Sequence, residues 1–179
     1  KNILIENAAG TQAVPIEPMP DILSNVDNGC YSTGYCLRKG GSFDQIHCMQ
    51  GKGFTGCPVF RAAEALLNYM EASYEVNGTV DATAAEYWRI LRKRAGVDED
   101  FQKTISLTDM QREKEGDWGA YSAGVLIDPT LFNIRRERRC ELMAEGLRDM
   151  DLHRWRAMDQ MITTPYHIEG INFWGGEMH

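Results

Sequence analysis

Residues 58–77 read PVFRAAEALLNYMEASYEVN, and their apolar positions recur at steps of three and four. This period is typical of a helix with one buried face. Pro58 suits the first turn of a helix, and the pair Asn77-Gly78 ends one. We therefore predict a helix over 58–77. Its apolar stripe consists of Val59, Ala62, Ala63, Leu66, Leu67, Met70 and Tyr74.

A second helix is predicted over 81–95, where Asp81 can cap the start and Gly96 can stop the end. Its cations at 92–94 lie in the last turn, where they suit the helix dipole. Two antiparallel helices joined by a short turn make a helical hairpin. Its apolar stripe consists of Ala84, Tyr87, Trp88 and Leu91.

Residues 97–127 show no sustained period, so we predict a long loop with one or two helical turns at 107–114. Loops of that length are often functional. Asp128-Pro129 then supplies a helix start, and a third helical stretch is predicted to about residue 158, with a break at Gly146.

The chain changes character near Pro58. Residues 1–57 hold eight of the seventeen glycines and nine charged residues, whereas residues 58–158 hold fifteen basic and eighteen acidic residues. We predict a loop-rich segment over 1–57 with short strands near 35–38 and 43–49, and a helical and C-terminal portion over 58–179. The fold class is mainly α with few short strands.

The whole chain has 179 residues and a net charge of −7. An acidic balance argues against a general nucleic-acid binder, which needs a dominant basic face. The sequence has no apolar run of about eighteen residues that could span a bilayer. It begins at Lys1 without a methionine or a secretion signal, so we expect a processed or truncated chain.

No catalytic or metal-binding pattern stands out, so we predict a protein that is not an enzyme and uses no cofactor or metal. Residues 51–56 fit a G-x-G-x-x-G string, but the strands that a dinucleotide site needs are missing. Two alternatives to idle thiols stay open. One is a zinc site built from His47 with Cys30, Cys36, Cys48 and Cys57, and the other is a hydrolase or redox site at His47-Cys48. The five cysteines are Cys30, Cys36, Cys48, Cys57 and Cys140.

Seven arginines and five acids alternate over 135–156, which indicates structural ion pairing. We predict that Arg138 pairs with Glu141 or Glu145. We also predict that Arg148 pairs with Asp151 or Asp149.

Three aromatic residues in predicted loops are the candidate ligand-binding residues: Trp118, Tyr121 and Trp174. A sugar packs its C–H face on an exposed ring while its hydroxyls take hydrogen bonds. A loop tryptophan that folds back into the core is the alternative for each.

Four blocks between residues 33 and 156 resemble, in order, segments of the SusD/RagB family. They are TGYCLRK at 33–39, RAAEALLNYMEA at 61–72, the stretch from Ala84 to RAGV at 94–97, and ERRCEL, EGLR, DL and RW between 137 and 155. Under this resemblance an architectural role falls on the motif residues Arg138, Glu141, Glu145, Arg148, Asp151 and Trp155.

The resemblance implies the C-terminal portion of a longer, mostly α-helical protein with TPR-like helical hairpins and a loop-rich irregular portion. It also implies a surface lipoprotein of the outer membrane whose lipid anchor and main ligand residues lie upstream of Lys1. Such a protein binds oligosaccharides, polysaccharides or peptides without catalysis and passes them to a SusC-like, TonB-dependent transporter. The alternative is a TPR-like protein-interaction scaffold with no small-molecule ligand.

Overall fold

The structure is a computed structural model that describes residues 2–7, 10–15, 37, 39, 40, 51–53, 56 and 58–163. The chain divides into two compact units, Lys1–Cys57 with Ile168–His179, and Pro58–His167, and each is described by itself. In the first unit, strands β1 (Asn2–Asn7) and β2 (Gly10–Pro15) pair antiparallel. The strands predicted near 35–38 and 43–49 fall almost entirely outside the described residues.

The second unit is helical and begins with a hairpin of α1 (Ala62–Asn77) and α2 (Ala82–Ala95), as the sequence predicts. Gly78 ends α1 at φ 67° and Gly96 ends α2 at φ 70°, a conformation that glycine adopts without strain. The predicted start of α1 at Pro58 is wrong. Arg61 is extended at φ −144° because its guanidinium is anchored to Glu145, and α1 starts after it.

The predicted long loop over 97–127 is wrong, although the helical turns predicted within it at 107–114 are found at Met110–Gly116. It contains α3 (Phe101–Ser106), α4 (Met110–Gly116), a short 3-10 turn η2 (Trp118–Ala120) and a hairpin of β3 (Tyr121–Ser122) and β4 (Val125–Leu126). These elements are too short to show a hydrophobic period. The first three are instead marked by aspartate caps at Asp100, Asp109 and Asp117, each of which accepts a backbone N–H.

The third helical stretch is broken where the sequence predicts a break. Helix α5 (Pro129–Glu141) begins at the Asp128 cap, and α6 (Arg148–Arg154) and α7 (Gln160–Thr163) follow. Between α5 and α6 the backbone takes positive φ at Ala144 and Gly146 (63° and 77°), which no continuous helix allows.

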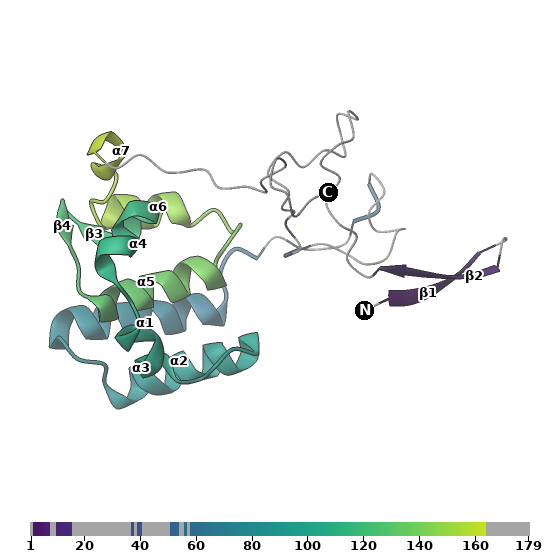
Figure 1. Cartoon of the computed structure of the whole chain (residues 1–179), viewed down its shortest axis with the longest axis horizontal. Coiled ribbons are helices and arrows are strands. Elements are labelled where there is room, and N and C mark those ends of the chain that lie inside the picture. The colour runs from purple at the N-terminus through teal and green to yellow at the C-terminus, as the bar shows by residue number, and fades with distance from the viewer. Residues whose placement is uncertain are drawn as a thin grey trace, which may run out of the picture. The chain divides into compact units, whose positions relative to one another are not determined.

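The core of this unit lies where α1 packs against both α2 and α5 (Figure 1). Leu67, Met70 and Ile134 are almost completely buried there. Trp88 stacks on Phe101 with ring centroids 4.5 Å apart, and this contact holds α3 against α2. The described part of the chain is therefore mainly α-helical. No helix within it combines the length and the apolar character that crossing a bilayer requires.

The cap of α2 gives a pH-dependent prediction. The Ser73 hydroxyl and the Ala84 amide donate to the Asp81 carboxylate, and these bonds lower the pKa of Asp81. A carboxylate whose pKa is lowered by folding stabilises the folded protein at every pH above its pKa in the unfolded chain, about 3.9. This stabilisation is lost as the pH falls through its pKa in the folded protein. Asp81→Asn should therefore lower the melting temperature at pH 7. The difference in melting temperature between the wild-type protein and the variant should narrow below about pH 4. A difference that stays constant down to pH 2 would contradict the assignment.

Candidate functional site

Three helices of the second unit present polar side chains that meet in its interior. On α1 and α6 these residues lie three or four positions apart, and on α5 Arg138 and Arg139 follow Arg135 by three and four positions, so each set shares one face. On α1 they are Glu64, Asn68, Glu71 and Glu75; on α5, Arg135, Arg138 and Arg139; on α6, Arg148, Asp151 and Arg154. We call Glu71, Arg135, Arg138, Arg148, Asp151, Arg154 and Trp155 the Trp155 cluster.

Glu71 is the central acceptor of this cluster and is only 3% exposed. It accepts two hydrogen bonds from Arg154, at 2.9 and 2.5 Å, and one from the indole N–H of Trp155. The Nε atom of Arg135 lies 3.6 Å from the same carboxylate. Glu71 therefore ties α1 to both α5 and the end of α6.

Asp151 is the second buried acceptor. It lies between Arg138, whose Nε donates at 2.7 Å, and Arg154, whose Nε donates at 2.9 Å. Arg138 also donates to the side chain of Asn68 at 2.8 Å and lies 3.9 Å from Glu64. The predicted pairing of Arg138 with Glu141 or Glu145 is wrong, because Arg138 faces α1 and α6 rather than the end of its own helix.

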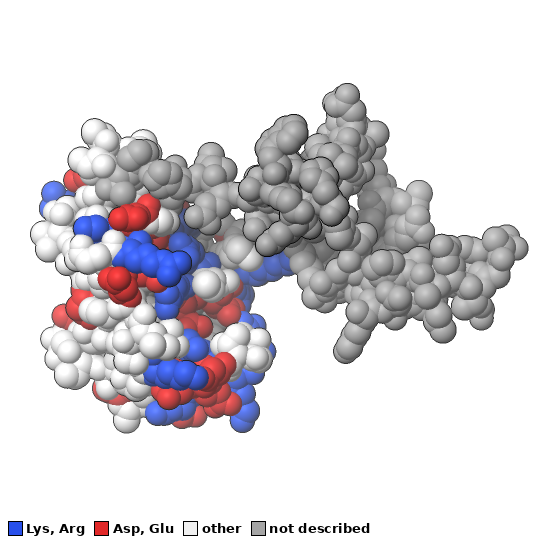
Figure 2. Space-filling model, in the orientation of Figure 1, with Lys and Arg blue, Asp and Glu red and all other residues white. Residues whose placement is uncertain are grey.

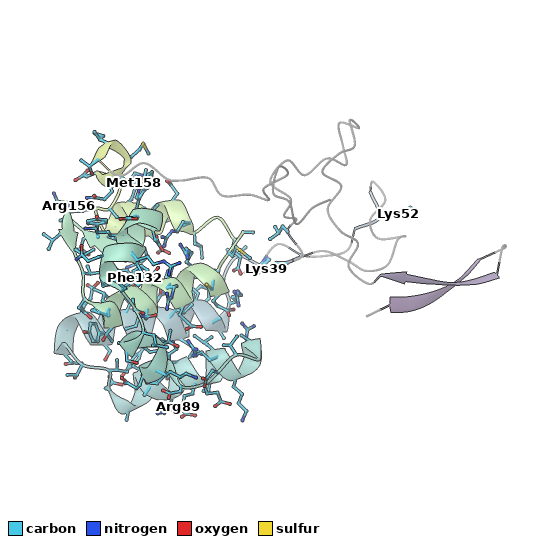
Figure 3. All side chains as sticks on the ribbon, in the orientation of Figure 1. Lys39, Lys52, Arg89, Phe132, Arg156 and Met158 are labelled. Atoms are coloured by element: carbon cyan, nitrogen blue, oxygen red, sulfur yellow. The ribbon has the colours of Figure 1, made fainter. Side chains whose placement is uncertain are left out.

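Trp155 is 4% exposed and has three guanidinium groups around its ring. Those of Arg135, Arg154 and Arg148 lie 4.3, 4.8 and 5.3 Å from the ring centroid. A tryptophan face attracts cations, so the ring contributes to holding three like charges in one place. The Trp155 carbonyl also accepts from the amide of Ala123, which ties the β3–β4 hairpin to the end of α6, near the labelled Arg156 and Met158 (Figure 3).

The guanidinium groups of the cluster differ in pKa. Burial lowers the pKa of Arg135, although Glu71 and Glu75 act in the opposite direction. Burial also disfavours the charged form of Arg154, but its bonds to Glu71 and Asp151 outweigh that effect and raise its pKa. Both guanidinium groups have carboxylate partners: Glu71 and Glu75 face Arg135, and Glu71 and Asp151 bind Arg154.

Asp117 forms a second centre of charge beside the cluster. Its carboxylate is 3% exposed and accepts from Arg148, from Arg139 at 2.7 Å and from the amide of Gly119 at 2.8 Å. The predicted pairing of Arg148 with Asp151 or Asp149 is therefore wrong. The sequence offered one signal that was missed: an aspartate placed two residues before a small residue, as in a turn cap.

Gly119 allows the close approach of Arg148. A Cβ atom at this position would lie 2.8 Å from Nη2 of Arg148 and 3.0 Å from Oδ1 of Asp117. Gly119→Ala should therefore displace this ion pair and lower the free energy of unfolding by about 1–3 kcal/mol. Gly116→Ala is the matched control, because nothing lies within 4 Å of its Cβ position. Equal urea midpoints for the two variants would contradict the close approach.

Glu141 and Glu145 anchor the entry to α1 and do not pair with Arg138. Arg61 donates to the carboxylate of Glu145 and to that of Glu141. Arg94 also pairs with Glu141. The pKa of Arg61 is raised, first by its bonds to Glu145. On the face shown in Figure 2, basic and acidic side chains of this unit lie next to one another.

The three aromatic candidates end up in different surroundings. Trp118 is 8% exposed and packs with Leu152 and Trp155, which counts against stacking of a sugar on its ring. Tyr121 is half-buried beside a cluster around Phe132. Trp174 lies outside the described residues.

The described residues contain no group of three or more His, Cys, Asp or Glu side chains arranged to hold a metal ion. Cys140 is a free, exposed thiol. His47 and the other four cysteines lie outside the described residues. In the described unit many acidic and basic groups form ion pairs, an arrangement that fixes geometry.

These features define a helical scaffold in which three helices are joined by buried ion pairs around one tryptophan. The family model of the SusD family matches residues 21–172, and the chain belongs to this family. Members of this family are generally non-catalytic binding proteins of nutrient uptake. No curated protein and no solved structure matches the chain.

Proposed function

We propose that the protein is a non-catalytic glycan-binding component of a cell-surface uptake system and works with a SusC-like, TonB-dependent transporter. The observation that carries this proposal is the family match over residues 21–172. The family's sequence blocks at 61–72 and 137–155 supply most of the Trp155 cluster, which supports an architectural role for them. In this view 1–57 and 58–179 are parts of one SusD-like domain.

The protein would act at the outer face of the outer membrane, held there by a lipid anchor upstream of Lys1. Its ligand would bind by ring stacking and hydrogen bonds, with Tyr121 and Trp174 as the remaining aromatic candidates. A stacked ring contributes about 0.5–1.5 kcal/mol beyond its buried area.

Calorimetry with a panel of oligosaccharides tests this function on the full-length protein. Tyr121→Ala and Trp174→Ala should each weaken glycan binding by about three- to tenfold. Tyr69→Ala is the control, because this exposed ring on α1 (42%) lies outside the proposed site. Turnover of a substrate without any glycan binding would rule the proposal out.

A protein-interaction scaffold without its own small ligand is the second candidate. One observation favours it: Trp88, Trp118 and Trp155, the tryptophans of the described unit, are 0%, 8% and 4% exposed. None of the three offers a ring to a sugar. This candidate predicts that the transporter co-purifies with the protein while calorimetry detects no glycan. The leading proposal predicts that the transporter co-purifies and that calorimetry detects glycan binding.

A further inference from the structure

A small pocket opens at the turn between α5 and α6. Its volume is about 150 Å³, enough for a carboxyl group and a few carbon atoms. The apolar side chains of Leu142, Met143 and Leu147 form much of its wall. Three arginines, at positions 138, 139 and 148, also line it.

Two of these arginines are incompletely compensated. Arg139 and Arg148 share one buried carboxylate, that of Asp117. Arg138 also shares its carboxylate, Asp151, with Arg154, but a second carboxylate, Glu64, lies 3.9 Å from Arg138. The pocket wall therefore carries more positive than negative charge.

Arg139 also keeps unused donors. Nη1 of Arg148 is buried beside Gly119 and, within the described part of the chain, has no hydrogen-bond partner, so a ligand in the open pocket meets the charge of Arg148 rather than this atom. The side chain of Arg139 is 41% exposed, and among the described residues it donates only through Nη1, to Asp117.

We propose that this pocket binds a carboxylate on a short aliphatic stem. Guanidinium groups match the planar carboxylate in charge and in geometry. The apolar wall at Leu142, Met143 and Leu147 covers the stem, whereas the hydroxyl groups of a sugar would lose their hydrogen bonds there. The carboxylate has two sources, a free short-chain acid or the C-terminus of a peptide. This proposal does not depend on the proposed glycan site.

Ligand-observed NMR titration of the full-length protein tests the proposal with butyrate and its neutral counterpart butyramide. Butyrate should bind with a Kd of about 1 mM, within the limit for so small a ligand, and butyramide should not saturate. Free and C-terminally amidated Ala-Ala-Val separate the two sources. Tighter binding of the free peptide than of butyrate assigns the pocket to peptide ends.

Arg139→Gln should weaken butyrate binding about tenfold, because it removes the charge but keeps a donor for Asp117. Arg94→Gln is the matched control: this exposed arginine pairs with Glu141, outside the pocket, and its loss should leave the Kd unchanged. Met143→Trp fills the pocket from an exposed position without altering its charge and should abolish binding.

Circular dichroism verifies that each variant is folded before the titration. The proposal is overturned if butyramide binds as well as butyrate, if no butyrate binding is detected, or if Arg139→Gln and Arg94→Gln change the Kd equally. Unchanged binding in a folded Met143→Trp variant would also place the carboxylate elsewhere.

Discussion

Glu71→Ala is expected to lower the free energy of unfolding by about 3–5 kcal/mol, the usual result of leaving a buried charge without its partner. Glu71 is 3% exposed. It accepts hydrogen bonds from Arg154 and from the Trp155 indole, and it forms an ion pair with Arg135. Its removal leaves Arg135, itself 2% exposed, with only a half-exposed carboxylate, Glu75, 3.4 Å away. Since a domain is stable by about 5–15 kcal/mol, this single change removes a large part of the total.

Glu75→Ala is the control for this prediction. Glu75 lies one turn further along α1 and pairs with the same arginine, but its side chain is 50% exposed. Water screens such a pair, so its loss should change the free energy of unfolding by no more than about 1 kcal/mol. Urea unfolding of both variants measures the difference. If Glu71→Ala and Glu75→Ala proved equally mild, Glu71 would not be the central acceptor of the cluster.

The helix ends that the sequence predicts correctly depend on short-range chemistry. Gly78 and Gly96 end their helices at positive φ, and Asp81 and Asp128 cap theirs through backbone amides a few residues away. Such interactions can be predicted from neighbouring residues alone. The start of α1 cannot be predicted in this way, because Arg61 is bound by glutamates some eighty residues further along the chain.

Ion-pair partners were predicted poorly for the same reason. Arg138 and Glu141 are three residues apart on one helix, and a local rule pairs them. In the structure the turn at Ala144 and Gly146 folds α6 back, and this brings Asp151 to Arg138. Trp118 follows the alternative given for a loop tryptophan and folds back into the core. Its contacts with Leu152 and Trp155 join residues far apart in the chain, so no local pattern in the sequence decides between the two interpretations.

The ring of Trp155 offers the second large effect. Trp155→Ala is expected to lower the free energy of unfolding by about 3–5 kcal/mol, because it leaves a cavity where a large ring was buried. It also leaves the guanidinium groups of Arg135, Arg148 and Arg154 without the face they share. Trp155→Phe should cost only about 1–2 kcal/mol, since it keeps an aromatic face and loses mainly the N–H bond to Glu71.

Trp155→Leu separates cavity formation from the attraction between ring and cation. Leucine fills part of the space but has no aromatic face, so this variant should be less stable than Trp155→Phe by about 1–2 kcal/mol. Equal urea midpoints for the leucine and phenylalanine variants would mean that the ring acts only by its volume. A larger loss of unfolding free energy with leucine would show that the aromatic face of Trp155 helps to hold the charges of Arg135, Arg148 and Arg154 together. Holding these charges together allows α1, α5 and α6 to meet at one point.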